Sequence, residues 1–190
     1  MWTLEEVGAN YEFNQMDFMK GDHKKEEYLK LNPNARVPTL VDDEAGLVLF
    51  ESAAICQYIA RAFPKAGLLP ERGGNQEAMH DQWMFWVVTE LEQALWSMGK
   101  HRFALPAEHR IPEMQKTALF EWQRATPVLA AALEKTPFII GEQMHLIDVM
   151  AAHTLLWARG FKVAFQSDAL EQFLDRMLAR PAYQACLRFD

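Results

Sequence analysis

The sequence has little cysteine: of its 190 residues only Cys56 and Cys186 carry a thiol, and no C-x-x-C pair occurs. Neither cysteine has a histidine at a metal-ligand spacing, so we expect no redox pair and no metal site. Free cysteine is among the residue types most often buried in proteins. Packing is therefore the favoured role for both residues.

Basic charge is also scarce. The chain has 19 Lys and Arg residues against 26 Asp and Glu residues, which gives a formal net charge of −7. The basic residues are scattered singly or in pairs such as Lys24–Lys25. No stripe of them is available to neutralise a run of phosphates, so we expect no nucleic-acid partner.

Long apolar runs are missing as well. Val128–Leu133, one of the longest, is far shorter than the ~20 residues that span a bilayer. Glu5 and Glu6 stand where a secretory signal would carry basic residues. We therefore expect a soluble, cytoplasmic protein without a membrane partner.

Apolar and aromatic residues, in contrast, are abundant. Half of the residues are hydrophobic, and they include 12 Phe and 6 Trp, far more than a disordered chain contains. A chain of this length buries roughly 70% of its unfolded surface. The composition therefore predicts a globular protein with one large domain or two small ones.

The first third of the chain alternates between helix and strand patterns. Residues 1–7 carry the apolar stripe of a helix, which Gly8 ends. Tyr11–Phe18 alternates as a strand does. Lys24–Leu31 is predicted to form a short helix that ends before Asn32–Pro33, because a residue before proline is disfavoured in the helical region.

A hairpin and a further helix follow. Val37–Val41 and Leu47–Phe50 are apolar runs, and the five residues between them include Gly46, a pattern typical of a hairpin. Ser52 then caps a helix that runs to about Phe63. Together these patterns predict an α/β domain over residues 1–63.

The remainder of the chain has helical patterns only. Residues 64–76 are rich in Pro and Gly and lack periodicity, which indicates a linker. Apolar residues then recur every three or four positions, so residues 77–190 are predicted to form an all-helical domain. The expected helices cover Met79–Met98, Met114–Leu133 with a kink at Pro127, Leu146–Ala158, Ala169–Leu178 and Pro181–Leu187.

The hairpin region carries features that suit a binding site. Proline inside a strand is tolerated only at an edge or a special turn, and a cis Val37–Pro38 bond would leave the Val37 backbone free to pair with an extended peptide. Glu51 and Ser52 open a helix, whose free N–H groups favour a carboxylate. By themselves, however, Pro38 and Ser52 fit an edge-strand proline and an ordinary helix cap better.

The combination of Asn-Pro, Val-Pro, a hairpin and Glu-Ser-x-Ala-Ile within Asn32–Tyr58 resembles the glutathione-binding half of the cytosolic glutathione transferases, in particular theta- or beta-like bacterial members. The helical remainder is similar to the second domain of that family. The resemblance implies a thioredoxin-like α/β domain followed by an all-α helical bundle. It also implies a homodimer and glutathione as co-substrate, with no metal.

Four residues at the hairpin receive roles from this resemblance. Val37 would make an antiparallel backbone pair with the cysteinyl unit of glutathione, and Pro38 would be the cis-proline that presents it. Glu51 and Ser52 would hold the γ-glutamyl end, where Ser52 meets the carboxylate and Glu51 the amino group.

Two further residues are implied at the other end of glutathione. His23 falls where related family members contact the glycyl carboxylate, and Arg36 lies close by for the same anion. Each also has a simpler interpretation. His23 fits equally well as a solvated loop residue, and Arg36 as an ordinary surface charge.

The chain departs from the family pattern in two stretches. Gly141 and Asp148 match the family's capping box, but His145 stands where a hydroxyl belongs. The strand and loop that precede the first helix in the family, and that carry its Tyr, Ser or Cys for thiolate stabilisation, have no counterpart before Met1. The resemblance therefore implies a domain without its first strand and a catalytic residue upstream of Met1.

The leading hypothesis is a glutathione transferase that passes the glutathione thiolate to a hydrophobic electrophile. Activity of this 190-residue chain is in doubt under that hypothesis, because its thiol-activating residue would lie upstream. The alternative is a glutathione-transferase-like binding or interaction protein without catalysis.

Overall fold

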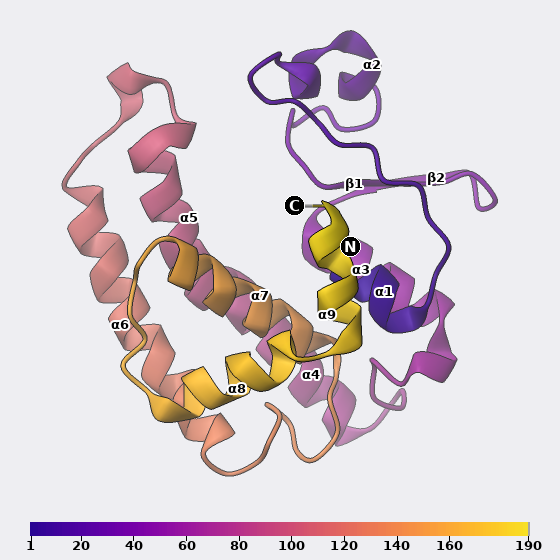
Figure 1. Cartoon of the computed structure of the whole chain (residues 1–190), viewed down its shortest axis with the longest axis vertical. Helices are drawn as coiled ribbons and strands as arrows, with labels where there is room; N and C mark the ends of the chain where they lie inside the picture. The colour runs from indigo at the N-terminus through magenta and orange to yellow at the C-terminus, as the bar shows by residue number, and fades with distance from the viewer. Residues whose placement is uncertain (190) are drawn as a thin grey trace.

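Helices make up most of the computed structural model, which describes residues 1–189 (Figure 1). Its sheet consists of two antiparallel strands, β1 (Thr39–Asp42) and β2 (Leu47–Phe50). The α-helices are α1 (Trp2–Val7), α2 (Glu26–Leu29), α3 (Ser52–Ala62), α4 (Asn75–Trp86), α5 (Gln93–Gly99), α6 (Met114–Leu133), α7 (Leu146–Gly160), α8 (Asp168–Leu178) and α9 (Pro181–Cys186). The strands and α1–α3 precede the helical remainder, as the sequence predicts.

The segment that follows α1 is not a strand, contrary to the prediction for Tyr11–Phe18. Gly8 ends α1 in the left-handed conformation with φ of 66°, and residues 11–17 then run without regular structure. Among the described residues no strand pairs with this segment. A strand needs a neighbouring strand for its backbone hydrogen bonds. The alternation of apolar and polar residues alone therefore does not make this segment a strand. The segment instead packs Phe13 against Phe189, with ring centroids 4.9 Å apart.

Two other elements are shorter than the sequence predicts. The helix expected at Lys24–Leu31 is split into a 3-10 turn at Asp22–Lys24 and α2, because Lys25 between them has extended backbone. Strand β1 begins at Thr39 rather than Val37, because Pro38 has no N–H to donate to a ladder. The Val37–Pro38 peptide bond is cis.

The long helix predicted from Met79 is interrupted by two π-helical segments, Val87–Glu92 and Lys100–Ala104. These segments join α4 to α5 and extend α5, so that residues 75–104 form one helical column. Helix α6 runs through Pro127 without interruption. A π segment holds an extra residue in its turn, which a sequence period of three to four does not reveal.

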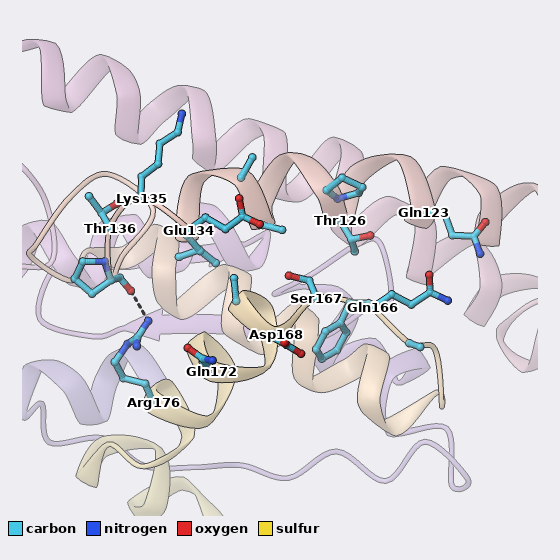
Figure 2. Close-up of a pocket in the computed structure, with 18 residues that line it drawn as sticks. Gln123, Thr126, Glu134, Lys135, Thr136, Gln166, Ser167, Asp168, Gln172 and Arg176 are labelled. Atoms are coloured by element: carbon cyan, nitrogen blue, oxygen red, sulfur yellow. Dashed lines mark hydrogen bonds between the residues drawn. The ribbon is translucent and has the colours of Figure 1, made fainter.

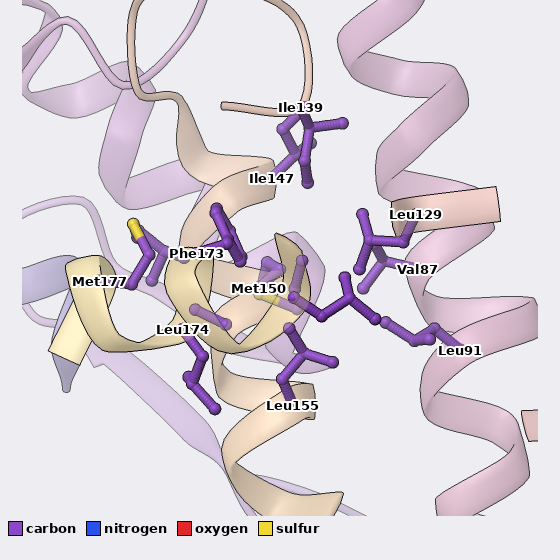
Figure 3. Close-up of a cluster of buried hydrophobic side chains, with 14 of the residues drawn as sticks. Val87, Leu91, Leu129, Ile139, Ile147, Met150, Leu155, Phe173, Leu174 and Met177 are labelled. Atoms are coloured by element: carbon purple, nitrogen blue, oxygen red, sulfur yellow. The ribbon is translucent and has the colours of Figure 1, made fainter. Parts of the chain in front are cut away.

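The core lies between the column of residues 75–104 and helices α6, α7 and α8 (Figure 3). Leu91 from the column and Leu129 from α6 are fully buried against α7 and α8. Helix α7 is central, because ten of its 15 residues are buried. Trp122 of α6 is also fully buried, and its indole N–H donates to the Ala164 carbonyl at 3.1 Å. No helix among residues 1–189 is both long and apolar enough to cross a membrane.

The start of α7 is held by the capping box that the sequence indicates. His145 occupies the N-cap position, and its backbone N–H donates to Asp148 Oδ2 at 2.7 Å. Asp148 Oδ1 accepts a second bond from the Ile139 N–H at 2.9 Å. The Nδ1 atom of His145 is buried without a hydrogen-bond partner. The carboxylate half of the box is therefore in place, whereas the histidine does not replace the missing hydroxyl.

A second histidine faces this cap. The rings of His80 from α4 and His145 lie with centroids 6.5 Å apart, and the two residues are only 1% and 4% exposed. The Nε2 atom of His80 also has no hydrogen-bond partner. Burial lowers the pKa of both imidazoles, and the nearby Asp81 carboxylate only partly offsets this for His80.

This pair predicts a loss of stability in mild acid. The unfolded histidines take up protons near pH 6.5, whereas the folded ones take them up only at lower pH, so unfolding is favoured as the pH falls through 6.5. We expect about 1 kcal/mol of stability to be lost between pH 7.5 and pH 6. Chemical denaturation at both pH values measures it. The loss should shrink in His80→Phe but persist in His109→Phe, which changes an exposed histidine; equal losses in both variants would contradict the assignment.

Candidate functional site

The four hairpin residues singled out in the sequence lie together. In the hairpin, Thr39 pairs with Phe50, so the Val37–Pro38 end of β1 lies beside the Glu51–Ser52 end of β2. Both pairs stand at the same end of the sheet, where the chain enters α3. The hairpin register thus builds one site from two segments of the sequence.

Val37 presents a free backbone at this site. Its side chain is 45% exposed, and within residues 1–189 its N–H and C=O make no hydrogen bond. Unpaired backbone groups in extended conformation are a template for another extended chain. Val37 is therefore able to receive one residue of a peptide.

The N-terminus of α3 supplies the second half of the site. The first hydrogen bond of this helix runs from the Ile55 N–H to the Glu51 carbonyl at 3.0 Å, and no side chain of the described residues caps it. The N–H groups that precede Ile55 are therefore left for a ligand, and the helix dipole favours an anion there. Ser52 is half-buried at the first helical position, with its hydroxyl beside these groups.

Glu51 adopts an uncommon backbone conformation. Its φ is 73° and its ψ is 110°, in the region that residues with a side chain rarely occupy. Such a conformation costs about 1–3 kcal/mol and is typical of ligand clamps. It also places a carboxylate at the site, next to Glu92 of the helical column. Burial and the negative charge of Glu51 raise the pKa of the Glu92 carboxyl.

Arg36 and His23 make their contacts outside the hairpin. The Arg36 guanidinium stacks over the ring of Trp96 in α5, 5.4 Å from its centroid, which ties the loop before Val37 to the helical column. His23 sits in the 3-10 turn Asp22–Lys24 with its ring against Phe18 at 4.8 Å, and its Nδ1 is buried without a partner. The structure gives no contact between His23 and the other five residues.

The sequence alone does not indicate Trp96 or Glu92 as neighbours of the site, and it indicates Asn32 only as a helix stop and as part of the Asn-Pro motif. Trp96 belongs to an aromatic stripe that is typical of a helix core, so no local signal separates it from packing residues. The side chains of Asn32 and Tyr28 converge on the loop that carries Val37. Only the fold brings these residues together.

A separate cavity lies in the helical part of the chain and is lined only by residues between 123 and 176. It has a volume of about 1030 Å³ and lies between the second half of α6, the loop after it and the start of α8 (Figure 2). Ser167 and Asp168 line it from one side and Thr126 from another. None of the six predicted residues lines this cavity. Among residues 1–189 no cluster of three or more His, Cys, Asp or Glu side chains suits a metal ion.

Comparison with known proteins identifies the family. The family model described as glutathione S-transferase, N-terminal domain, matches residues 1–61, and the one described as glutathione S-transferase, C-terminal domain, matches residues 93–181. The disulfide-bond oxidoreductase YfcG of Escherichia coli (strain K12) is 31% identical over 185 residues, which cover 94% of this chain and 84% of that protein.

Solved structures agree with these matches. The ternary complex of BphK, a bacterial GST, has a TM-score of 0.87 at 27% identity and covers 99% of this chain and 91% of its own. The glutathione transferase URE2P6 from Phanerochaete chrysosporium, in complex with oxidized glutathione, has a TM-score of 0.83 at 26% identity over 99% of this chain and 88% of its own. The predicted fold class is confirmed: a thioredoxin-like domain with a small two-stranded sheet precedes a helical domain. The chain belongs to the glutathione S-transferase family.

Proposed function

We propose that this chain binds glutathione at the end of the hairpin and presents its thiol to a hydrophobic electrophile. The observation that carries the proposal is the hairpin register, which sets the free Val37 backbone beside the uncapped N-terminus of α3. A tripeptide with two carboxylates fits a site that offers one backbone pair and one anion-binding helix end. The structure of the glutathione transferase URE2P6 in complex with oxidized glutathione supports a ligand of this class.

Within this proposal each residue has a defined task. Val37 pairs with the cysteinyl backbone and is presented by Pro38. Ser52 and the α3 N–H groups receive the γ-glutamyl carboxylate, while Glu51 receives the amino group. Arg36 and His23 are proposed for the glycyl carboxylate.

The division of the chain follows the sequence. We propose that residues 1–63 bind glutathione, that residues 64–76 link the domains, and that residues 77–190 hold the electrophile. Thiol activation is assigned to no residue among 1–189.

We also propose a cytoplasmic homodimer. The exposed face of the hairpin, with Val41, Val48 and Phe50 each more than a third exposed, supports a protein contact.

Binding is tested by titration calorimetry with reduced glutathione. Ser52→Ala should weaken binding and raise the dissociation constant about tenfold or more, because a hydrogen bond to a charged group contributes about 1.5–3 kcal/mol. The Ser52 hydroxyl makes no hydrogen bond within residues 1–189, so the melting temperature should stay unchanged. Wild-type protein that gives no binding heat at millimolar glutathione would refute the proposal.

Turnover is measured separately, with 1-chloro-2,4-dinitrobenzene as electrophile. Conjugation at a rate above the uncatalysed reaction supports a transferase. Binding of glutathione without turnover supports the alternative, a binding or interaction protein of the same family. The calorimetric result and the kinetic result thus decide between the two functions.

A further inference from the structure

Two side chains outside the proposed ligand set hold the loop that carries Val37. The Tyr28 hydroxyl, from α2, donates to the Arg36 carbonyl at 2.5 Å, and Asn32 Nδ2 donates to the same carbonyl at 2.8 Å. Asn32 is only 2% exposed. The two donors, four residues apart in the chain, therefore converge on a single oxygen next to the site.

The position of that oxygen matters because of peptide geometry. The Arg36 carbonyl and the Val37 N–H belong to the same peptide unit, which is planar. Fixing the direction of the carbonyl therefore fixes the direction of the N–H on its opposite side. In this structure the Val37 N–H is one of the two groups left free for an extended ligand.

The same two side chains also hold the far side of the loop. The Tyr28 hydroxyl lies 2.8 Å from Thr39 Oγ1, and Asn32 Nδ2 donates to that oxygen at 3.3 Å. Thr39 is the first residue of β1, directly after Pro38. The Val37–Pro38 pair is thus fixed from both ends, by the carbonyl before it and by the hydroxyl after it.

The Arg36 side chain is held against Trp96, but few other hydrogen bonds hold the backbone of this loop. Its internal hydrogen bonds run from the Ala35 N–H to the Asn32 carbonyl at 3.0 Å and from the Asn34 N–H to Asn32 Oδ1 at 3.1 Å, so they depend on Asn32 as well. Arg36, Val37 and Pro38 are exposed. Without the two donors no hydrogen bond would fix the direction of the Arg36 carbonyl.

We propose that Tyr28 and Asn32 are positioning residues that aim the Val37 N–H at the ligand, a role that rests on the glutathione site proposed above. Neither is expected to touch glutathione. Their contribution is to hold one peptide plane in its binding orientation before the ligand arrives, which reduces the ordering cost of binding.

The test uses a pair of matched variants, Tyr28→Phe and Tyr58→Phe. Each removes one tyrosine hydroxyl from the N-terminal domain. The Tyr58 hydroxyl donates to Asp42 Oδ2 at 2.7 Å, at the opposite end of the hairpin from Val37. Both variants should lose a similar amount of thermal stability, so Tyr58→Phe controls for a merely structural effect.

The two variants should differ in binding. We expect Tyr28→Phe to raise the dissociation constant for reduced glutathione about three- to tenfold, the range for one lost hydrogen bond, while Tyr58→Phe changes it less than twofold. If the protein conjugates 1-chloro-2,4-dinitrobenzene, Tyr28→Phe should raise KM for glutathione and leave kcat and KM for the electrophile unchanged. Equal binding by wild type and Tyr28→Phe, or an equal loss in both variants, overturns the inference.

The NMR order parameter of the Val37 backbone N–H provides a readout that does not need the ligand, because it reports how firmly the direction of this bond is held. It should be lower in Tyr28→Phe than in wild type and unchanged in Tyr58→Phe, measured without glutathione. An unchanged order parameter in Tyr28→Phe overturns the positioning role even if glutathione binds. A lower order parameter in a protein whose wild type binds no glutathione shows instead that the loop is held as inferred and that the proposed function is wrong.

Discussion

Replacing Arg180 by alanine is expected to lower the free energy of unfolding by about 2–4 kcal/mol, because its ion pair with Glu6 has one buried partner and one that is a third exposed, and so lies between a surface pair and a fully buried one. Arg180 Nε and Nη2 each donate to one oxygen of Glu6, both at 2.7 Å. The Glu6 side chain is only 5% exposed, so the variant would leave a buried carboxylate. The Trp2 indole N–H, which also donates to Glu6 at 2.9 Å, would remain as its neutral partner.

A neighbouring ion pair provides the control. Arg188 pairs with Glu5 at 2.6 Å, but the Arg188 side chain is 58% exposed. Surface pairs contribute at most about 1 kcal/mol, so Arg188→Ala should have a small effect. Urea denaturation of both variants at pH 7.5 measures the difference. Similar losses in the two variants would show that the Glu6 pair is not worth more than a surface contact.

A loss of about 2–4 kcal/mol is expected for Asp148→Ala. The carboxylate is fully buried and accepts the N–H groups of Ile139 and His145, which no other group replaces. Each buried N–H left without a partner costs about 1–3 kcal/mol. Asp148→Asn keeps one acceptor oxygen and should lose about half as much, when both variants are unfolded in urea at pH 7.5.

The Asp148 carboxyl also has its own dependence on pH. Burial raises its pKa to about 6, and this effect outweighs the two hydrogen bonds from the Ile139 and His145 N–H groups, which lower it. Between pH 6 and 3.8 the folded protein holds a proton that the unfolded chain has released, so this residue alone stabilises the fold as the pH falls through that range. Asp148→Asn should abolish this gain; an Asn variant with the same acid profile as wild type would contradict the assignment.

Elements with a complete local signal were predicted from the sequence. The hairpin follows from two apolar runs around a turn, and the helices of residues 77–190 from their period and caps. The prediction of a strand at Tyr11–Phe18 was wrong. Alternation describes which face a strand would bury, whereas a strand also needs a neighbour to receive its hydrogen bonds. The π-helical segments were missed because one extra residue per turn hardly alters the apolar spacing.

The site was predicted only in part for a similar reason. Val37, Pro38, Glu51 and Ser52 carry recognisable sequence features, and the register brings them together. Tyr28 carries none, and the Asn-Pro motif at Asn32 does not reveal its contacts, because both roles depend on hydrogen bonds to a carbonyl and a hydroxyl that only the folded loop places in reach. Likewise, no local pattern indicates that Glu6 pairs with a residue 174 positions later.

The contact between α1 and α9 has a consequence for the order in which the protein folds during synthesis (Figure 1). A ribosome releases the N-terminal residues first, and N-terminal domains commonly fold first. Here Trp2 packs against Tyr183 with ring centroids 4.9 Å apart, and Glu6 finds its cation at Arg180. Trp2 and Glu6 therefore lack these partners until α9 has left the ribosome. The packing of α1 cannot be completed while residues 1–63 alone have been synthesised.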